Sequence, residues 1–208
     1  LINDDFTYAY PSTAAILAIG DRISSNFLVK TVGNIKHGES LTSPINVKGE
    51  LAILSSLAAG YTIICKSNML GIKSTEDFEI SIKTRAINPT TFDAYSLNME
   101  GLFFGFYDFG ANSPKLCFRA VSDRANWVFY DGATATNSTV PTTTYANLIM
   151  RRIDGTLNAY INGNLVKTVS DGSSLDTFYI ACTGTASASS QELFAIDYIR
   201  IWAGEINR

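Results

Sequence analysis

Residues 148–169 read LIMRRIDGTLNAYINGNLVKTV, three strand-like runs that are separated by Asp154-Gly155 and by Asn162-Gly163. A two-residue turn between antiparallel strands requires positive φ angles, which Gly, Asn and Asp adopt at low cost. Asp-Gly and Asn-Gly between alternating apolar residues are therefore strong signals of β-hairpins. This stretch predicts an antiparallel meander of three strands.

The same pattern of short strands extends through the rest of the chain. Phe78, Ile80 and Ile82 share one face of a predicted strand, and the polar residues between them share the other. The apolar run 49–59 is compatible with a strand or with a short helix, and residues 133–144, rich in Ala, Thr, Asn and Ser, are expected to form a surface loop. Further strands are expected at 6–10, 26–32, 61–66, 102–107, 115–121, 126–130, 177–183 and 192–202, and one begins near Tyr145.

Two motifs resemble one known superfamily. A strand that ends in Arg152-Ile153-Asp154-Gly155, followed by a strand that ends in Tyr160-Ile161-Asn162-Gly163, is similar to the late strands of laminin G-like and other concanavalin A-like jelly-roll domains. The run Phe194–Trp202 resembles the closing strand of the same superfamily. The resemblance implies an all-β fold, a two-sheet antiparallel β-sandwich, in which the closing strand pairs with a strand from the N-terminal part of the chain.

Length and charge exclude some classes of protein. The chain has 208 residues, a formal net charge of −3 and a pI near 5.1. One jelly-roll domain can occupy residues 1–208, and the lack of a basic excess argues against nucleic acid as a partner. The apolar runs are too short for membrane insertion, which takes about 20 consecutive apolar residues. Because the sequence starts at Leu1 without Met or a leader, we expect a processed chain or a module of a longer one.

Cysteine usage indicates a reducing environment during folding. Cys65, Cys117 and Cys182 are odd in number and lie far apart within apolar runs. This arrangement is typical of buried free thiols, with one disulfide plus one free thiol as the alternative. We therefore predict folding in a reducing cytoplasm.

The sequence lacks the residue patterns of the common hydrolases. Some concanavalin A-like proteins are glycoside hydrolases, and retention needs two carboxylates about 5–5.5 Å apart. The laminarinase-like spacing Glu-x-Asp-x-Glu is absent, and Asp197 stands alone in its strand. The single histidine, His37, is expected in a solvated turn and has no nucleophile motif to serve. The sequence predicts that the chain is not an enzyme, with a glycoside hydrolase whose carboxylates converge from different strands as the alternative.

Metal and glycan sites would use different residues. No cofactor is expected, although calcium can be held by loop oxygens, and Asp108, Asn112 and Asp123 are the candidate ligands. Glycan binding would use exposed aromatic rings with polar neighbours, with core or cross-strand packing of the same rings as the alternative. Tyr198 and Trp202 are assigned to structure. The candidate rings are Trp127, Tyr130 and Tyr107, and the candidate polar groups are Arg119, Arg124, Asn126 and Asp131.

Three functions follow from these observations. The first is a carbohydrate-binding, lectin-like module on a cell or virion surface, with a polysaccharide or a glycoprotein glycan as its partner. The second is a structural or decoration protein of a phage or virus particle, in contact with capsid or tail proteins. The third is the glycoside hydrolase with an atypical carboxylate pair. A homo-oligomer is a further possibility, since 192–202 is expected to be a long edge strand that needs a partner or a cover.

Overall fold

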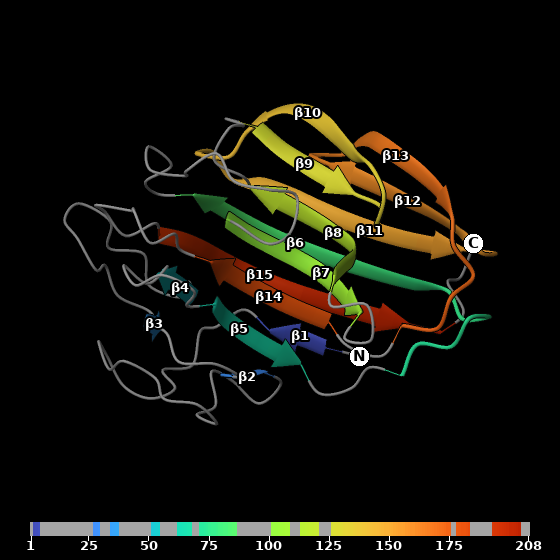
Figure 1. The fold of residues 1–208 in the computed structure, drawn as a ribbon, viewed down its shortest axis with the longest axis horizontal. Coiled ribbons are helices and arrows are strands. Elements are labelled where there is room, and N and C mark those ends of the chain that lie inside the picture. The colour runs from blue at the N-terminus through green and yellow to red at the C-terminus, as the bar shows by residue number, and fades with distance from the viewer. Residues whose placement is uncertain are drawn as a thin grey trace.

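A computed structural model of the chain describes residues 2–4, 27–29, 34–37, 51–54, 62–67, 71–86, 101–108, 113–120, 126–175, 178–183 and 193–204. The strands within these ranges form two antiparallel sheets. Figure 1 shows the sheets stacked face to face, with their strands running in similar directions. Sheet A has the order β13 (Asn164–Ser170), β12 (Thr156–Ile161), β11 (Ala146–Ile153), β6 (Phe78–Ala86), β15 (Leu193–Ala203), β4 (Leu51–Leu54) and β3 (Asn34–His37), and β1 (Ile2–Asp4) also pairs with β15. Sheet B has the order β10 (Ala135–Pro141), β9 (Asn126–Tyr130), β8 (Ser113–Ala120), β7 (Gly101–Asp108), β14 (Phe178–Thr183), β5 (Thr62–Ser67) and β2 (Phe27–Val29).

The predicted meander is confirmed as β11, β12 and β13. Asp154 and Gly155 have φ angles of 50° and 73°, and Asn162 and Gly163 have φ angles of 51° and 79°. Both central residues of each turn are thus left-handed, as a type I′ hairpin requires. The Oδ1 of Asn162 also accepts a hydrogen bond of 2.8 Å from the amide of Asn147, which ties the second turn to β11.

The core lies between the sheets and follows the alternation along each strand. Phe78, Ile80 and Ile82 of β6 are fully buried, as predicted, and face Phe104, Phe118 and other apolar side chains of sheet B in one cluster. Edge-to-face aromatic contacts join the two layers, with 5.9 Å between the ring centroids of Phe78 and Phe106. Burial of this cluster supplies the main driving force for folding.

One stretch was predicted wrongly. Residues 133–144 were expected to form a loop, but β10 (Ala135–Pro141) lies inside that range and pairs with β9. β10 is an edge strand with one neighbour in its sheet, so most of its small polar side chains can face solvent and give no apolar period. Pro141 ends the strand, where its missing N–H is tolerated.

Several other predictions have clear outcomes in the fold. Residues 51–54, for which a strand and a helix were both possible, form the strand β4. His37 was expected in a turn, but it is the last residue of the strand β3 and pairs with Leu51. β15 is interior and not an edge, because it pairs with β6 on one side and with β4 and β1 on the other. Its pairing with β1 confirms the expected partner near the N-terminus. The predicted strand 6–10 lies outside the described residues.

A buried arginine holds the loops at one end of sheet A. Arg152 of β11 is 1% exposed, and its guanidinium donates hydrogen bonds to the carbonyls of Lys73 (2.5 Å), Glu76 (2.9 Å) and Ser173 (2.6 Å). The guanidinium also lies 5.0 Å from the ring centroid of Phe78. These contacts join residues 71–77 to residues 171–175, which pair through the bridge between Ile72 and Leu175.

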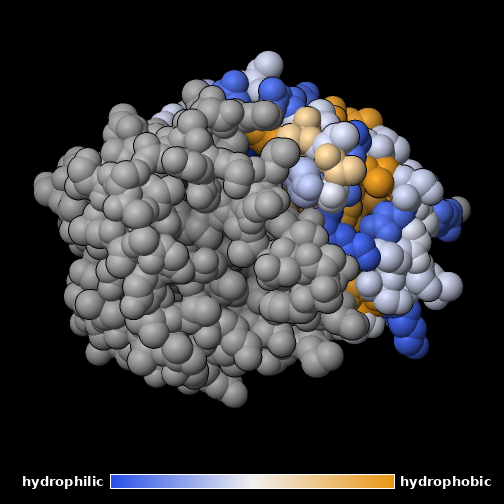
Figure 2. All heavy atoms as spheres, in the orientation of Figure 1, coloured by the Kyte–Doolittle hydropathy of each residue, from blue (hydrophilic) through white to orange (hydrophobic). Residues whose placement is uncertain are grey.

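Across the described ranges there is no helix with the length and apolar character needed to cross a bilayer. Hydrophilic and hydrophobic residues are interspersed over the coloured part of the surface in Figure 2.

Candidate functional site

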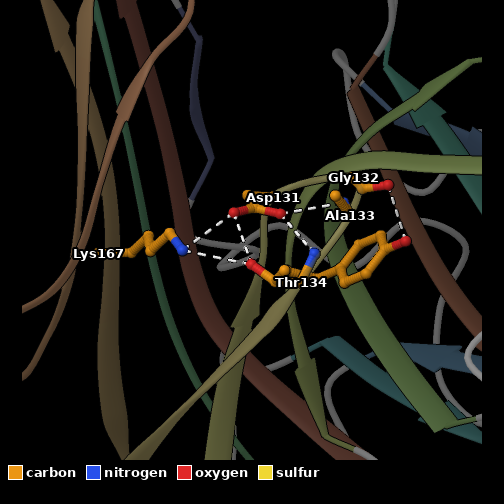
Figure 3. A network of polar contacts seen from close by, with 6 residues as sticks. Asp131, Gly132, Ala133, Thr134 and Lys167 are labelled. Carbon is orange, nitrogen blue, oxygen red and sulfur yellow. Dashed lines mark hydrogen bonds and ion pairs between the residues drawn. The ribbon is translucent and has the colours of Figure 1, made fainter.

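Asp131, a predicted glycan ligand, closes the turn between β9 and β10 (Figure 3). Its Oδ1 accepts hydrogen bonds from the amides of Ala133 (2.9 Å) and Thr134 (2.6 Å), and its Oδ2 accepts one from the Thr134 hydroxyl (2.8 Å). Lys167 on β13 approaches the same Oδ2 to 3.1 Å. Both carboxylate oxygens are therefore engaged inside the protein and hold the turn, while the predicted contact of Asp131 with a glycan stays a prediction.

The charge of Asp131 is stabilised by these contacts. Burial alone would raise the pKa of the Asp131 carboxyl, but the hydrogen bonds from Thr134, Ala133 and Lys167 outweigh burial and hold that pKa well below its usual range. Asp131 therefore remains ionised at any physiological pH and keeps its ion pair with Lys167.

Trp127 does not present a ring to solvent. The side chain is 0% exposed and belongs to the core cluster between the sheets, where its ring centroid lies 6.1 Å from that of Phe104. Trp127 and Phe129 are two residues apart on β9, so their side chains point to the same face of sheet B. Both belong to the core cluster. The prediction that Trp127 stacks on a sugar is therefore wrong.

Arg119 and Tyr130 lie on the opposite face of sheet B, away from the core. The Arg119 guanidinium lies 5.5 Å from the ring centroid of Tyr130, whose hydroxyl donates a 2.9 Å hydrogen bond to the carbonyl of Gly132. Arg119 is only 4% exposed, and Asn126 and Tyr130 are half-buried. The structure thus brings Arg119 and Tyr130 together, but with little of Arg119 open to a ligand.

Cys117 lies on the same outer face of sheet B and is a free thiol, as predicted. Burial raises the pKa of Cys117 to about 12, against the opposing effect of the nearby Arg119 guanidinium. The thiol is therefore protonated and unreactive at neutral pH. Cys65 and Cys182 lie in β5 and β14, where only the backbone is described.

The remaining predicted site residues fall on parts of the chain with a limited description. Tyr107 and Asp108 end β7, and only their backbone is described, while Asn112, Asp123 and Arg124 lie outside the described residues. Within the described ranges, no group of three or more His, Cys, Asp and Glu side chains is close enough together to hold a metal ion. Calcium binding stays a prediction.

Sequence reasoning missed the outer face of sheet A, which faces away from the core. It carries aromatic and charged side chains of β6, β11 and β15 together with Tyr145, and we call it the sheet A face. Its described residues are Glu79, Ser81, Lys83, Arg85, Tyr145, Asn147, Ile149, Arg151, Asp197, Tyr198, Arg200 and Trp202. All of them are at least partly exposed.

Ion pairs and ring contacts fix much of this face. Lys83 Nζ lies 2.5 Å from Asp197 Oδ2 and 5.1 Å from the ring centroid of Tyr145. The Arg85 guanidinium lies 4.4 Å from the centroid of the same ring. A tyrosine ring flanked by two cations is electrostatically favourable because the ring face is negative.

β15 places the other two rings of the face. Arg200 lies 4.4 Å from the ring centroid of Tyr198, and the Tyr198 hydroxyl lies 3.1 Å from Oδ1 of Asn147, to which it donates a hydrogen bond. Trp202 is paired in register with Glu79, whose carboxylate forms a 2.5 Å ion pair with Arg151. Tyr198, Arg200 and Trp202 alternate with the buried Ile199 and Ile201, so all three point outward.

The sequence contained a signal for this face. Alternation along residues 198–202 separates Ile199 and Ile201 from Tyr198, Arg200 and Trp202. Tyr198 and Trp202 were assigned to structure, and the contacts of Tyr198 with Asn147 and Arg200 agree with that role, but both rings are also partly exposed.

Comparison with solved structures identifies the architecture. A sialidase matches over 97% of this chain and 18% of its own length, with a TM-score of 0.65 and 10% identity. An alginate lyase from Corynebacterium sp. matches over 79% of this chain and 83% of its own, with a TM-score of 0.56 and 13% identity. The fold is a two-sheet antiparallel jelly roll, as the resemblance to concanavalin A-like domains implied. The predicted fold class is confirmed.

A third solved structure aligns with this chain along almost its full length. Its description names endo-acting O-glycanases that prominent members of the human gut microbiota express to initiate mucin breakdown. The match covers 100% of this chain and 99% of the other, with a TM-score of 0.58 and 11% identity. No protein-family model matches this jelly roll. No curated protein matches it in sequence.

These matches correct one prediction. The chain was predicted not to be an enzyme because one carboxylate spacing is absent, but the solved structures that it matches include an alginate lyase, a sialidase of which it covers 18%, and one whose description names O-glycanases. The absence of Glu-x-Asp-x-Glu is therefore no ground for excluding catalysis by this jelly roll. At sequence identities of 10–13%, the similarity to these structures establishes the fold alone.

Proposed function

We propose that this jelly roll engages a carbohydrate polymer on the sheet A face. The observation that carries the proposal is that Tyr198 and Trp202 emerge from the same side of β15, beside Asn147 and Arg200. Aromatic rings pack on the apolar faces of sugars, while amide and guanidinium groups bond to their hydroxyls.

The arrangement of the two rings favours an extended ligand. Four residues along a strand separate Tyr198 from Trp202 by about 13 Å, which is longer than one pyranose ring. Tyr198 is held in place by Asn147 and Arg200, so little side-chain freedom is lost when a ligand binds. We expect oligosaccharides and polymers to bind more tightly than monosaccharides.

Cleavage of the bound polymer is a second candidate function. It is supported by the matches to proteins named as a sialidase, an alginate lyase and O-glycanases, which share this fold. The expected display on a cell or virion surface, and contact with capsid or tail proteins, stay predictions that this proposal does not need.

Tryptophan fluorescence offers a direct test of the location. The chain contains two tryptophans, and Trp127 is buried in the core while Trp202 is half-buried on the sheet A face. A glycan array first identifies polysaccharides that bind. Titration of each is then expected to change the emission of the wild type and of Trp127→Phe, but not the emission of Trp202→Phe. The bound polymers are also analysed for new chain ends.

Matched variants distinguish the two sheets. Tyr198→Ala is expected to weaken binding by about tenfold or more, since stacked aromatic rings at binding sites contribute about 1–2 kcal/mol. Tyr130→Ala, which removes a predicted ligand ring from the outer face of sheet B, is expected to leave binding within about twofold. Binding that is lost in Tyr130→Ala and kept in Tyr198→Ala would overturn the proposed location, and an array without any bound glycan would overturn the function.

A further inference from the structure

The strand β15 contains a β-bulge at Asp197. Ile196 pairs in register with Thr84 of β6, and Tyr198 pairs with Lys83, so Asp197 is an extra residue without a counterpart on β6. Ile196 is fully buried, whereas Asp197 and Tyr198 are both partly exposed. In a regular strand, two successive side chains point to opposite faces. The bulge therefore brings two neighbouring side chains to the sheet A face, and bulges that re-aim a side chain are frequent next to binding and active sites.

A buried hydroxyl group supports the bulge from the neighbouring strand. Thr84 lies on the core side of β6, in line with Ile80 and Ile82, and is 0% exposed. A polar side chain is costly at such a position unless it forms a hydrogen bond. The Thr84 hydroxyl donates a 2.8 Å hydrogen bond to the carbonyl of Ala195, two residues before Asp197. This bond fixes the backbone of β15 where the irregular register begins.

The bulge leaves one carboxylate oxygen of Asp197 open to a ligand. Oδ2 of Asp197 lies 2.5 Å from Nζ of Lys83, and the Asp197 side chain is 35% exposed. Among the residues that the structure describes, no donor forms a hydrogen bond with Oδ1 of Asp197. An ionised carboxylate is a strong acceptor for a hydroxyl group. The contact with Lys83 also restrains the side chain, so that less freedom is lost when a ligand binds.

We infer that Oδ1 of Asp197 accepts a hydrogen bond from a hydroxyl group of the sugar that packs on Tyr198. This inference rests on the proposed function, because it names a polar contact of the same site. Asp197 and Tyr198 are adjacent on β15 and both oppose Lys83, so a sugar on the tyrosine ring reaches the carboxylate with the hydroxyl groups on its rim. The site therefore takes a sugar with a free hydroxyl group at that position.

The first test removes the carboxylate with and without its partner. The probes are laminarin, dextran, alginate and polygalacturonate, together with any polysaccharide that the glycan array identifies. Asp197→Ala is expected to weaken binding by about tenfold, and by the same factor in a Lys83→Gln background. Glu76→Ala removes the same charge from the loop before β6, outside the sheet A face, and should change binding by less than about twofold.

The second test alters the bulge itself. Deletion of Asp197 removes the extra residue and can leave the flanking pairs in register, Ile196 with Thr84 and Tyr198 with Lys83. We expect a folded protein that binds about tenfold more weakly. Thr84→Val, which removes the supporting hydroxyl, should weaken binding by about threefold, and Thr84→Ser, which keeps it, by less than about twofold. Thermal unfolding shows which variants are folded.

The third test changes the polymer. O-methylation of a bound polysaccharide removes its hydroxyl donors and keeps its sugar rings. The wild type is expected to bind the methylated form at least about tenfold more weakly, and Asp197→Ala to show a smaller difference between the two forms. Equal binding of both forms by the wild type would overturn the inference.

The outcomes separate this inference from the proposed function. If Asp197→Ala binds as tightly as the wild type while Tyr198→Ala weakens binding, the role of Asp197 is overturned and the carbohydrate function stands. If the loss in Asp197→Ala disappears in the Lys83→Gln background, Asp197 acts only through its ion pair, and the inference is overturned as well. If the deletion variant does not fold, Asp197→Ala alone decides. If no polysaccharide binds, both proposals fall.

Discussion

Lys167 Nζ on β13 lies 3.1 Å from Oδ2 of Asp131, which follows β9, so an ion pair joins the two sheets at one edge of the sandwich. β13 is the edge strand of sheet A, and Asp131 precedes β10, the edge strand of sheet B. Lys167 also donates a 3.3 Å hydrogen bond to the Thr134 hydroxyl within the same turn. The turn is therefore fixed by its own hydrogen bonds and also by the opposite sheet.

Asp131→Asn should reduce stability in a manner that depends on pH. The folded-state pKa of Asp131 is lower than the unfolded value of about 3.9. Its contribution is therefore fully present above that unfolded value and is lost as pH falls through the folded-state pKa. We expect Asp131→Asn to lower the free energy of unfolding by about 1–2 kcal/mol at pH 7.

Denaturant unfolding at pH 7, 4 and 2.5 checks this expectation. The difference between the wild type and Asp131→Asn should be largest at pH 7 and should shrink at the lowest pH. A difference that grows on acidification would show that the ionised carboxylate does not stabilise the turn.

Arg152→Leu should strongly destabilise the protein. It removes a buried guanidinium and leaves the carbonyls of Lys73, Glu76 and Ser173 without their donors. Unsatisfied buried polar groups cost about 1–3 kcal/mol each, so we expect a loss of at least about 3 kcal/mol in chemical denaturation.

The neighbouring Arg151 provides the matched control for Arg152. Arg151 points to the opposite face of β11 and forms a partly exposed pair with Glu79. Arg151→Leu should therefore cost less than about 1 kcal/mol. Equal losses in Arg151→Leu and Arg152→Leu would contradict the role assigned to Arg152.

Gly105→Ala should disrupt sheet B. A Cβ atom at Gly105 would lie 2.0 Å from the carbonyl oxygen of Leu116 and 2.6 Å from Cα of Cys117, both in β8. These are backbone atoms of a paired strand and cannot move without breaking the ladder, so we expect a loss of more than about 3 kcal/mol or failure to fold. Gly172→Ala, where a Cβ atom would meet nothing within 4 Å, is the control and should stay within about 0.5 kcal/mol.

Cys117 should resist thiol reagents while the protein is folded. Its thiol is buried, and its pKa is raised to about 12, so the reactive thiolate is scarce at pH 8. A variant that keeps only this cysteine, Cys65→Ala with Cys182→Ala, should react with a disulfide reagent only as fast as it unfolds, and fully in denaturant. Rapid labelling of this variant under native conditions would show that the outer face of sheet B opens.

The strands of the meander could be predicted because their signals are local. The left-handed angles at Asp154, Gly155, Asn162 and Gly163 follow from residue type, and alternation marks Phe78, Ile80 and Ile82 as one face. β10 was missed because an edge strand requires no apolar period. Trp127 was assigned to the surface because its neighbours in the strand were expected to supply the core face, but Trp127 itself lies in the core together with Phe129.

Local residue patterns are enough to predict the all-β class, most of the strands and the turns between them, because residue type limits the φ angles and the alternation of side chains shows the strands. The partners of Arg152, the contact of Asp131 with Lys167 and the gathering of Arg85, Tyr145, Tyr198 and Arg200 on one face arise from the packing of distant strands. These contacts join strands far apart in the chain. Their geometry depends on strand order and register, which pairing over long sequence separations sets and local patterns do not encode.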